Sequence, residues 1–416
     1  QESIEAGDPQ GALRLYRDYL GSRPDQPVDR LLLARLLLAA GHAGEARAEL
    51  ESLVDEPGAN GEVLLTLAHL ERITGNPDRQ REVLERALEI DPDNPAVLGA
   101  IGSSHLEDEE FEEAAALFRR ALEINPMEGQ AIHGLGVVLL NQEEYGEALE
   151  TLDRAVEADP GNALLYTDRA RARAALKDSD GAVGDLTRAI DLDPEFYWNY
   201  IDRGRHFLQM RRLPEAEADF SRAIQTDPEI FLPYVYRAGI YDRLDRRSEA
   251  IADYRRVVEL NPEYFFAYAP LGVLCYLEEE WESAAAAFRR AYLSEPDNPS
   301  YALLAALSWM KLGQDRTART YLGEQLGKFP VDAWPTLIAR YFLNPALEGR
   351  TVDAAGRIQN KLDRARALFF IASRLLQEQR IETALRYLLL VREIERPDLP
   401  EKRIAEQLLR NFGYQD

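Results

Sequence analysis

The sequence predicts an all-α solenoid built from stacked two-helix units, and three observations support this prediction. One pattern repeats every 34 residues, nine times, without an insertion or a deletion. Alanine returns at one phase of the pattern, from Ala114 to Ala318, and proline returns at another, from Pro92 to Pro330. A strict period of this length is typical of identical helix pairs, each of which packs only on its neighbours.

The first helix of each unit is predicted from residues at helical spacing. With position 1 set at Pro27 and at every 34th residue after it, position 4 is apolar or aromatic from Leu64 onwards and position 8 is always alanine or glycine. Positions 4, 7, 8 and 11 share one face of a helix, because residues three and four apart are neighbours on it. We therefore expect these four positions to face the core.

The second helix follows the same logic and ends at the proline. Position 20 is almost always alanine, position 24 is bulky, as in Phe118 and Leu152, and position 27 is often alanine again. Small residues at positions 8 and 20 allow the two helices to approach closely. Proline at position 32 ends the helix, because proline has no N–H and pushes the preceding residue out of the α region.

Composition excludes several classes of function. The formal net charge is −24, and an acidic surface of this size repels phosphate, so we expect neither nucleic acid nor anionic membrane as a partner. No apolar run approaches the ~20 residues that span a bilayer. Cys275 is the single cysteine, which excludes an internal disulfide and a thiolate metal cluster. The five histidines have no metal-binding spacing and no nucleophile–base arrangement is present, so we expect no catalytic site, no metal and no cofactor.

The repeat resembles the tetratricopeptide repeat family. The resemblance depends on the small residue at position 8, alanine at 20 and 27, an aromatic or leucine at 24 and proline at 32, in register from Pro27 to Asp332. It implies antiparallel helix pairs in a right-handed superhelix. It also implies that the first helices line a concave groove that binds peptides or other proteins.

Positions 2, 5, 9, 12 and 13 of such repeats usually face the groove. Relatives that hold chaperone C-termini carry lysine and asparagine at positions 5 and 9, and neither residue stands there in this chain. Arginine suits bidentate capture of a carboxylate, so an acidic or C-terminal group on the partner is one expectation. The alternative is that Arg171 and Arg205 pair with Asp168 and Asp202. The candidate groove residues at positions 5 and 9 are Arg35, His69, His133, Arg171 and Arg205.

Large apolar residues at position 2 form a second candidate. Trp198, Leu232 and Phe266 stand at this position in three successive units, where the core does not require them. They are candidates for a partner-binding ridge. The alternative is that they pack between consecutive units.

One charged pattern is regular and predicted to be structural. Arginine replaces the usual apolar residue at position 7 of three units, and aspartate stands at position 23 of the same units. A partly buried arginine without a carboxylate is costly, so we expect ion pairs between the helices. The pairs are Arg169 with Asp185, Arg203 with Asp219, and Arg237 with Asp253.

The predicted organisation has five parts. Residues 1–26 form a half repeat with the second helix only, 27–332 form nine full units, 333–364 form a degenerate repeat, 365–400 form a repeat-like helix pair, and 401–416 form a capping helix. Because the chain opens in mid-repeat without an initiating methionine, we expect a processed or trimmed protein.

The sequence predicts a non-catalytic scaffold or adaptor that binds a peptide or protein in its groove. One alternative is a self-assembling or obligate structural subunit of a larger envelope complex, so a homo-oligomer stays possible. Another is the regulatory repeat array of an enzyme whose catalytic domain lies outside this chain. A bacterial source is expected, with the periplasm preferred to the cytoplasm as the compartment.

Overall fold

A computed structural model describes residues 8–20, 27–54 and 61–414, and within these ranges it contains helices and no strand. The all-α fold is therefore confirmed for the described part of the chain. The chain divides into two compact units, unit 1 over Gln1–His206 and unit 2 over Phe207–Asp416. Of the predicted half repeat, the first seven residues and residues 21–26 lie outside the described ranges. None of the described helices is long and apolar enough to span a bilayer.

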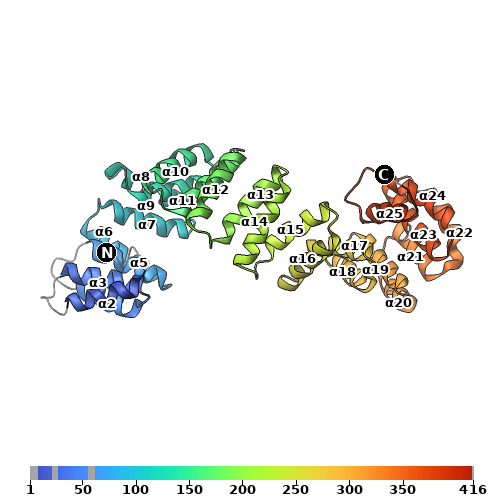
Figure 1. Ribbon diagram of the computed structural model, residues 1–416, viewed down its shortest axis with the longest axis horizontal. Coiled ribbons are helices and arrows are strands. Elements are labelled where there is room, and N and C mark those ends of the chain that lie inside the picture. The colour runs from blue at the N-terminus through green and yellow to red at the C-terminus, as the bar shows by residue number, and fades with distance from the viewer. Residues whose placement is uncertain (1–7, 21–26, 55–60, 415–416) are drawn as a thin grey trace. The chain divides into compact units, whose positions relative to one another are not determined.

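Unit 1 is a row of helix pairs whose first helices also contact one another, as the series α3, α5, α7, α9 and α11 shows (Figure 1). The last helix of the row, α13, crosses the division between the units. The helices are α2 (Pro9–Leu20), α3 (Pro27–Ala39), α4 (Ala43–Val54), α5 (Gly61–Ile73), α6 (Pro77–Ile90), α7 (Pro95–Glu107), α8 (Phe111–Ile124), α9 (Gly129–Asn141), α10 (Tyr145–Ala158), α11 (Ala163–Ala175), α12 (Ser179–Leu192) and α13 (Tyr197–Gln209).

Unit 2 continues the helical pattern and then becomes irregular. Two short 3-10 helices interrupt it, and α23 begins at Lys361, before the predicted start of the last pair. The elements are α14 (Leu213–Thr226), α15 (Leu232–Arg243), α16 (Arg247–Leu260), η1 (Phe265–Ala267), α17 (Tyr268–Leu277), α18 (Trp281–Ser294), α19 (Pro299–Lys311), α20 (Asp315–Leu326), α21 (Trp334–Leu343), η2 (Pro345–Leu347), α22 (Glu348–Gly356), α23 (Lys361–Gln377), α24 (Ile381–Arg392) and α25 (Pro400–Asn411).

The small residue at position 8 makes room for the bulky residue at position 24. Phe118 and Phe288 are completely buried. A Cβ atom added to Gly102 would lie 2.7 Å from the Phe118 ring, and one added to Gly272 would lie 2.7 Å from the Phe288 ring. Each unit that carries phenylalanine here thus needs glycine opposite, since interiors packed at crystal-like density have no spare volume.

The proline carbonyl at position 32 is a hydrogen-bond acceptor that joins consecutive 34-residue repeats. The hydroxyl of Tyr268 at position 4 donates to the Pro262 carbonyl oxygen at 3.0 Å, and Arg290 donates to the same oxygen at 3.4 Å. Tyr166 donates in the same way to Pro160 at 3.2 Å. The tyrosines at position 4 thus face the core, as predicted, and also bind the preceding repeat, because a buried hydroxyl needs a partner.

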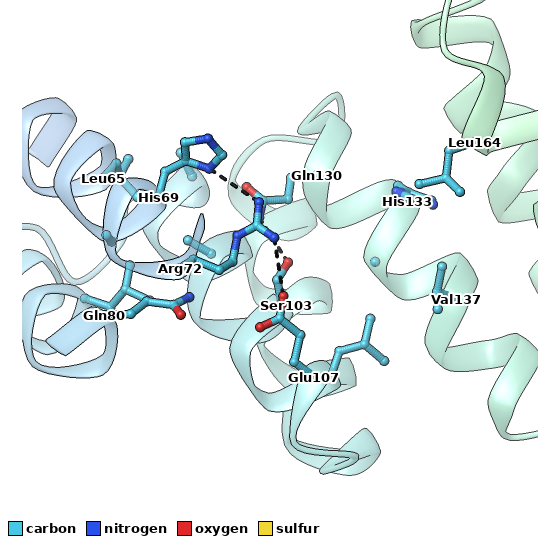
Figure 2. A pocket seen from close by; sticks show the side chains of 16 residues that line it. Leu65, His69, Arg72, Gln80, Ser103, Glu107, Gln130, His133, Val137 and Leu164 are labelled. Carbon is cyan, nitrogen blue, oxygen red and sulfur yellow. Dashed lines mark hydrogen bonds and ion pairs between the residues drawn. The ribbon is translucent and has the colours of Figure 1, made fainter. Parts of the chain in front are cut away.

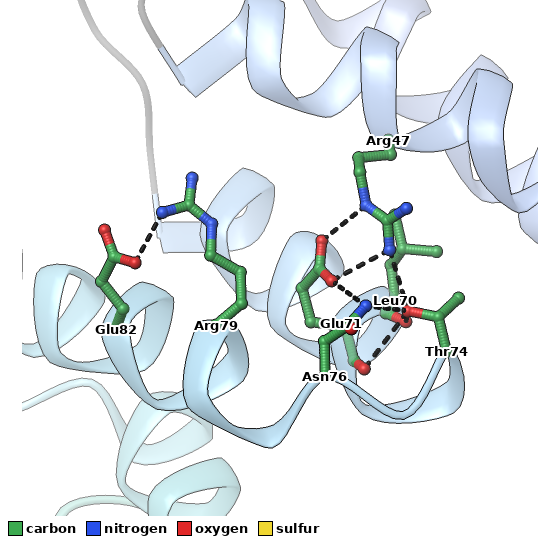
Figure 3. A network of polar contacts seen from close by, with 7 residues as sticks. All are labelled: Arg47, Leu70, Glu71, Thr74, Asn76, Arg79 and Glu82. Carbon is green, nitrogen blue, oxygen red and sulfur yellow. Dashed lines mark hydrogen bonds and ion pairs between the residues drawn. The ribbon is translucent and has the colours of Figure 1, made fainter.

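A second polar network joins α4 to α5 (Figure 3). Glu71 is 2% exposed, and Arg47 donates two hydrogen bonds to its carboxylate at 2.8 and 2.9 Å. Asn76 donates a third at 2.8 Å. Burial alone raises the pKa of Glu71, but the hydrogen bonds from Arg47 and Asn76 outweigh it and leave the pKa lowered. The network therefore contributes stability above the ordinary Glu pKa, which is lost as the pH falls through the lowered value.

The turn between the two helices of each 34-residue repeat needs a residue in the left-handed backbone conformation at position 15. Gly41, Gly75 and Gly313 supply it in three repeats, with φ near 80°. In the other repeats a non-glycine residue adopts the same backbone conformation, namely Glu109, Glu143, Lys177, Arg211, Asp245 and Glu279. Since left-handed backbone is unfavourable for residues with a Cβ atom, these turns store strain.

Replacing Glu109, Glu143 and Lys177 together by glycine is expected to raise the free energy of unfolding of unit 1 by about 1–3 kcal/mol. Each change relieves backbone strain at a residue whose φ is 61–64°. The greater flexibility of glycine in the unfolded chain offsets only part of this gain. Urea denaturation followed by circular dichroism measures the change. As a control, Gly75→Ala is expected to lose about 1 kcal/mol, since its φ is 75° and its surroundings are empty. A neutral triple variant would show that these turns carry no strain.

The C-terminal helix α25 does more than cover the last helix pair. It contacts α23 and α24, and it also folds back onto α17, far earlier in the chain. Ile404 and Leu409 are buried there, and Leu408 is partly buried. In unit 2, part of the first-helix face is thus occupied by the chain itself.

Candidate functional site

A pocket of about 520 Å³ opens on the first-helix face of unit 1, across α5, α7 and α9. Figure 2 shows side chains from the three helices around it. The walls come from Leu65 and His69 on α5 and from His133 and Val137 on α9. Between these walls α7 carries the small side chains of Ala96, Ala100 and Ser103, which keep the floor low, and Leu106 and Glu107 line the pocket at the end of the same helix.

One side of the pocket is cationic. Arg72 lies between His69 and Glu107, with 3.4 Å from its Nη2 atom to His69 Nδ1 and 3.6 Å from Nη1 to the Glu107 carboxylate (Figure 2). Burial lowers the pKa of His69, and the charge of Arg72 lowers it further. His69 therefore stays neutral at pH 7 and offers one ring nitrogen as donor and one as acceptor.

The opposite side is polar. Gln130 donates a hydrogen bond to the Ser103 hydroxyl at 3.0 Å. His133 lies 2.8 Å from the carboxylate of Asp168, which is itself buried. The pocket thus brings together the two predicted groove residues His69 and His133, with different polar partners.

The predicted groove arginines remain accessible, although each has an acidic partner. The side chain of Arg171 is 52% exposed and lies 3.0 Å from Asp168, and that of Arg205 is 51% exposed and lies 3.2 Å from Asp202. Arg35 is 50% exposed and lies 3.3 Å from Glu62. Arg171 and Arg205 therefore make the pairings of the alternative interpretation, and all three arginines keep about half of their side-chain surface exposed.

The predicted aromatic residues divide between the two units. Trp198, in unit 1, is 40% exposed and packs against Tyr197 with ring centroids 5.2 Å apart. Phe266, in unit 2, is 76% exposed and contacts Tyr264 edge to face at 5.7 Å. Leu232 is half-buried. A ridge across all three residues stays a prediction. Of the two ridge residues in unit 2, Leu232 and Phe266, only Phe266 has a largely exposed side chain.

Two of the predicted ion pairs lie within one compact unit each. Arg169 donates to Asp185 at 2.7 and 3.0 Å and also to Asp153 at 2.8 Å. Arg237 donates to Asp253 twice at 2.8 Å. Arg203 donates to the Thr187 hydroxyl at 3.0 Å within unit 1, and its pairing with Asp219 stays a prediction.

Among the residues that line the pocket, the sequence predicted His69 and His133. It did not predict Gln130 at position 2, Arg72 at position 12 or Glu107 at position 13. The signal was available, because all three positions face the groove in repeats of this type. Within the described residues no group of three or more His, Cys, Asp or Glu side chains could hold a metal ion.

Comparisons with known proteins agree with this architecture. Family models described as tetratricopeptide repeat match residues 3–70, 61–104, 100–163, 167–229, 201–265 and 236–302. The comparison with curated proteins gave no match.

Several solved structures are similar to parts of the chain. PilF of Pseudomonas aeruginosa is 21% identical over 49% of this chain and 92% of its own, with a TM-score of 0.44. A tetratricopeptide repeat protein from Parabacteroides merdae is 17% identical over 59% of this chain and 97% of its own, with a TM-score of 0.42. YrrB, described as a repeat protein with an unusual peptide-binding site, is 21% identical over 44% and 95%, with a TM-score of 0.40. At such identities the likeness concerns the fold alone.

The 34-residue period, the helix pairs with their small and bulky partners, and the family matches lead to one conclusion: the chain belongs to the tetratricopeptide repeat family.

Proposed function

We propose that the groove of unit 1 binds an extended segment of a partner protein, in which a carboxylate lies next to an apolar side chain. Tetratricopeptide repeats serve as protein-interaction scaffolds, which gives the class of ligand. The observation that carries the proposal is the pocket of Figure 2, where an accessible arginine borders an apolar floor.

The carboxylate is inferred from the groove arginines. Arg72 is 44% exposed and its distance to Glu107 is 3.6 Å, so its ion pair is long and solvated. Such pairs contribute only about 0–1 kcal/mol, and a ligand carboxylate can replace the internal one at little cost. Arginine also offers two parallel donors, which favours a carboxylate over a neutral acceptor. In a chain of net charge −24, a row of accessible arginines on one face is a selective feature.

The apolar part is inferred from the pocket floor. Leu65, Ala100 and Val137 border the cavity, and its volume of about 520 Å³ lies within the usual range for a bound side chain or small ligand. Since the floor exists only because α7 carries small residues, a larger side chain there removes it.

A peptide library displayed with free C-termini tests the proposal. We expect selected peptides to be enriched in Asp, Glu or a terminal carboxylate beside a Leu, Ile or Phe. Their affinity for the Arg72→Ala variant is expected to be about tenfold lower than for the unmodified protein, which corresponds to about 1.4 kcal/mol. Their affinity for the unmodified protein is expected to weaken as salt is added.

The matched control is Arg79→Ala in the same unit. Arg79 is 46% exposed and pairs with Glu82 at 2.6 Å, but it does not border the pocket (Figure 3). It should leave the affinity unchanged. Selection of basic peptides, or an equal loss in both variants, would contradict the proposal.

A further inference from the structure

The first-helix face of unit 2 is covered where that of unit 1 is open. In unit 1, the exposed residues at position 9 include Arg35, His69 and Arg171. In unit 2, the same position holds Val273, 4% exposed, on α17, and Tyr276 at position 12 of α17 is 3% exposed. The helix that packs against α17 from outside the repeat is α25.

α25 is held in this groove by an apolar face and by polar anchors at one end. Ile404, Ala405 and Leu409 belong to the same buried cluster as the α17 residues. Arg403 donates two hydrogen bonds to Asp242, at position 12 of α15, one of them at 2.8 Å. Arg247, at the start of α16, donates to Gln407 at 2.8 Å. These are the contacts that a bound amphipathic helix would make.

One residue of α25 opposes its docking. Glu401 is completely buried beside Ser300 of α19, and within the described residues neither of its carboxylate oxygens makes a hydrogen bond of acceptable geometry. Burial raises the pKa of Glu401, and Ser300, its own backbone N–H and Arg366 of α23 offset this only in part. A buried carboxylate without full pairing is unfavourable. Docking is therefore strongest at low pH and weakens as the pH rises above the ordinary Glu value.

We propose that unit 2 carries a second protein-binding groove, across α15, α17 and α19, which accepts an amphipathic helix and which α25 occupies as a replaceable internal occupant. The favoured partner is a helix with apolar residues at the positions of Ile404 and Leu409, a basic residue to pair with Asp242, and a neutral residue in place of Glu401. Such a helix keeps every favourable contact of α25 and lacks its buried charge, so it competes with α25 for the groove. The proposal uses a different surface from the unit 1 pocket and does not depend on it.

The test uses the full chain and a fluorescent synthetic peptide of residues 398–414 that carries Glu401→Gln. Fluorescence anisotropy gives its affinity for the unmodified protein and for Arg403→Glu, Glu401→Gln and Arg386→Glu. Arg403→Glu places a carboxylate opposite Asp242 and releases α25, so the peptide is expected to bind at least tenfold more tightly than to the unmodified protein. Glu401→Gln strengthens the internal docking, so the peptide is expected to bind at least threefold more weakly.

Arg386→Glu is the control, because Arg386 lies on α24 with a side chain 72% exposed, and it should leave the affinity unchanged. Hydrogen exchange on the same proteins should show α25 amides exchanging at least tenfold faster in Arg403→Glu, with α20 unaffected. Equal peptide affinity for the unmodified protein and Arg403→Glu, with α25 released, would overturn the proposal. If Arg403→Glu does not fold, Glu401→Gln decides alone: no gain in α25 protection and no loss of peptide affinity reject the proposal. Dimers of Arg403→Glu that the peptide cannot dissociate would also reject it, in favour of exchange between copies.

Discussion

Arg237→Met is expected to lower the free energy of unfolding of unit 2 by about 3–5 kcal/mol, which is the usual cost of removing one partner from a buried ion pair. Arg237 donates two hydrogen bonds at 2.8 Å to Asp253, whose side chain is 7% exposed. Methionine fills a similar volume but leaves the Asp253 carboxylate buried without them. Urea denaturation, with hydrogen exchange of the α15 and α16 amides to locate the loss, measures the effect.

The double variant Arg237→Met with Asp253→Leu is the control for this prediction. Because it removes both charges together, it is expected to recover most of the lost stability. Arg386→Ala, which breaks an exposed pair with Glu382 at 2.9 Å, should change stability by less than about 0.5 kcal/mol. A small loss in Arg237→Met would mean that water reaches Asp253 and that the pair is not structural.

Gly134→Ala is expected to destabilise unit 1 by about 2 kcal/mol, although alanine is the better helix former by about 1 kcal/mol. A Cβ atom at Gly134 would lie 2.2 Å from Phe118 Cζ, and Phe118 is completely buried with little space to move. Steric overlap therefore outweighs helix propensity. Denaturation midpoints, with hydrogen exchange of α8 and α9, report the loss.

Two further variants separate overlap from propensity. Gly239→Ala lies within α15 and meets nothing within 4 Å, so it should gain about 0.5–1 kcal/mol. Phe118→Leu combined with Gly134→Ala should be more stable than the sum of the two single changes predicts, because leucine leaves room for the new methyl group. Simple additivity in that pair would contradict the proposed contact.

The helix pairs and their packing could be predicted from sequence because the relevant interactions are local. Position 8 contacts position 24 of the same unit, as Gly272 and Phe288 show, and Arg169 reaches Asp185 at a separation of 16 residues. Both pairs are separated by less than one 34-residue period, so the same pairing recurs at the same positions of successive repeats. Glycine at position 15 indicates the left-handed residue in three repeats, but the acidic or basic residues at this position in the other repeats do not indicate it.

The unit 1 pocket was predicted in part. His69 and His133 were found from their groove positions, whereas Arg72 at position 12 and Gln130 at position 2 were not predicted. The volume of the pocket could not be predicted, because it depends on how the side chains of several helices pack around it and not on any single residue.

The sequence by itself determined the stacked helix pairs, the helix ends near each proline and the close approach of the two helices at small residues, because each depends on contacts within a repeat or between adjacent repeats. Only the tertiary structure decided where α25 docks, since Arg403 and Asp242 are 161 residues apart and no periodic pattern links them. One sign of it was present: α17 is apolar on nearly every face, and a helix of that kind must be covered on all sides. The sequence could show that a cover was needed, but the identity of the cover depends on how the chain returns in space.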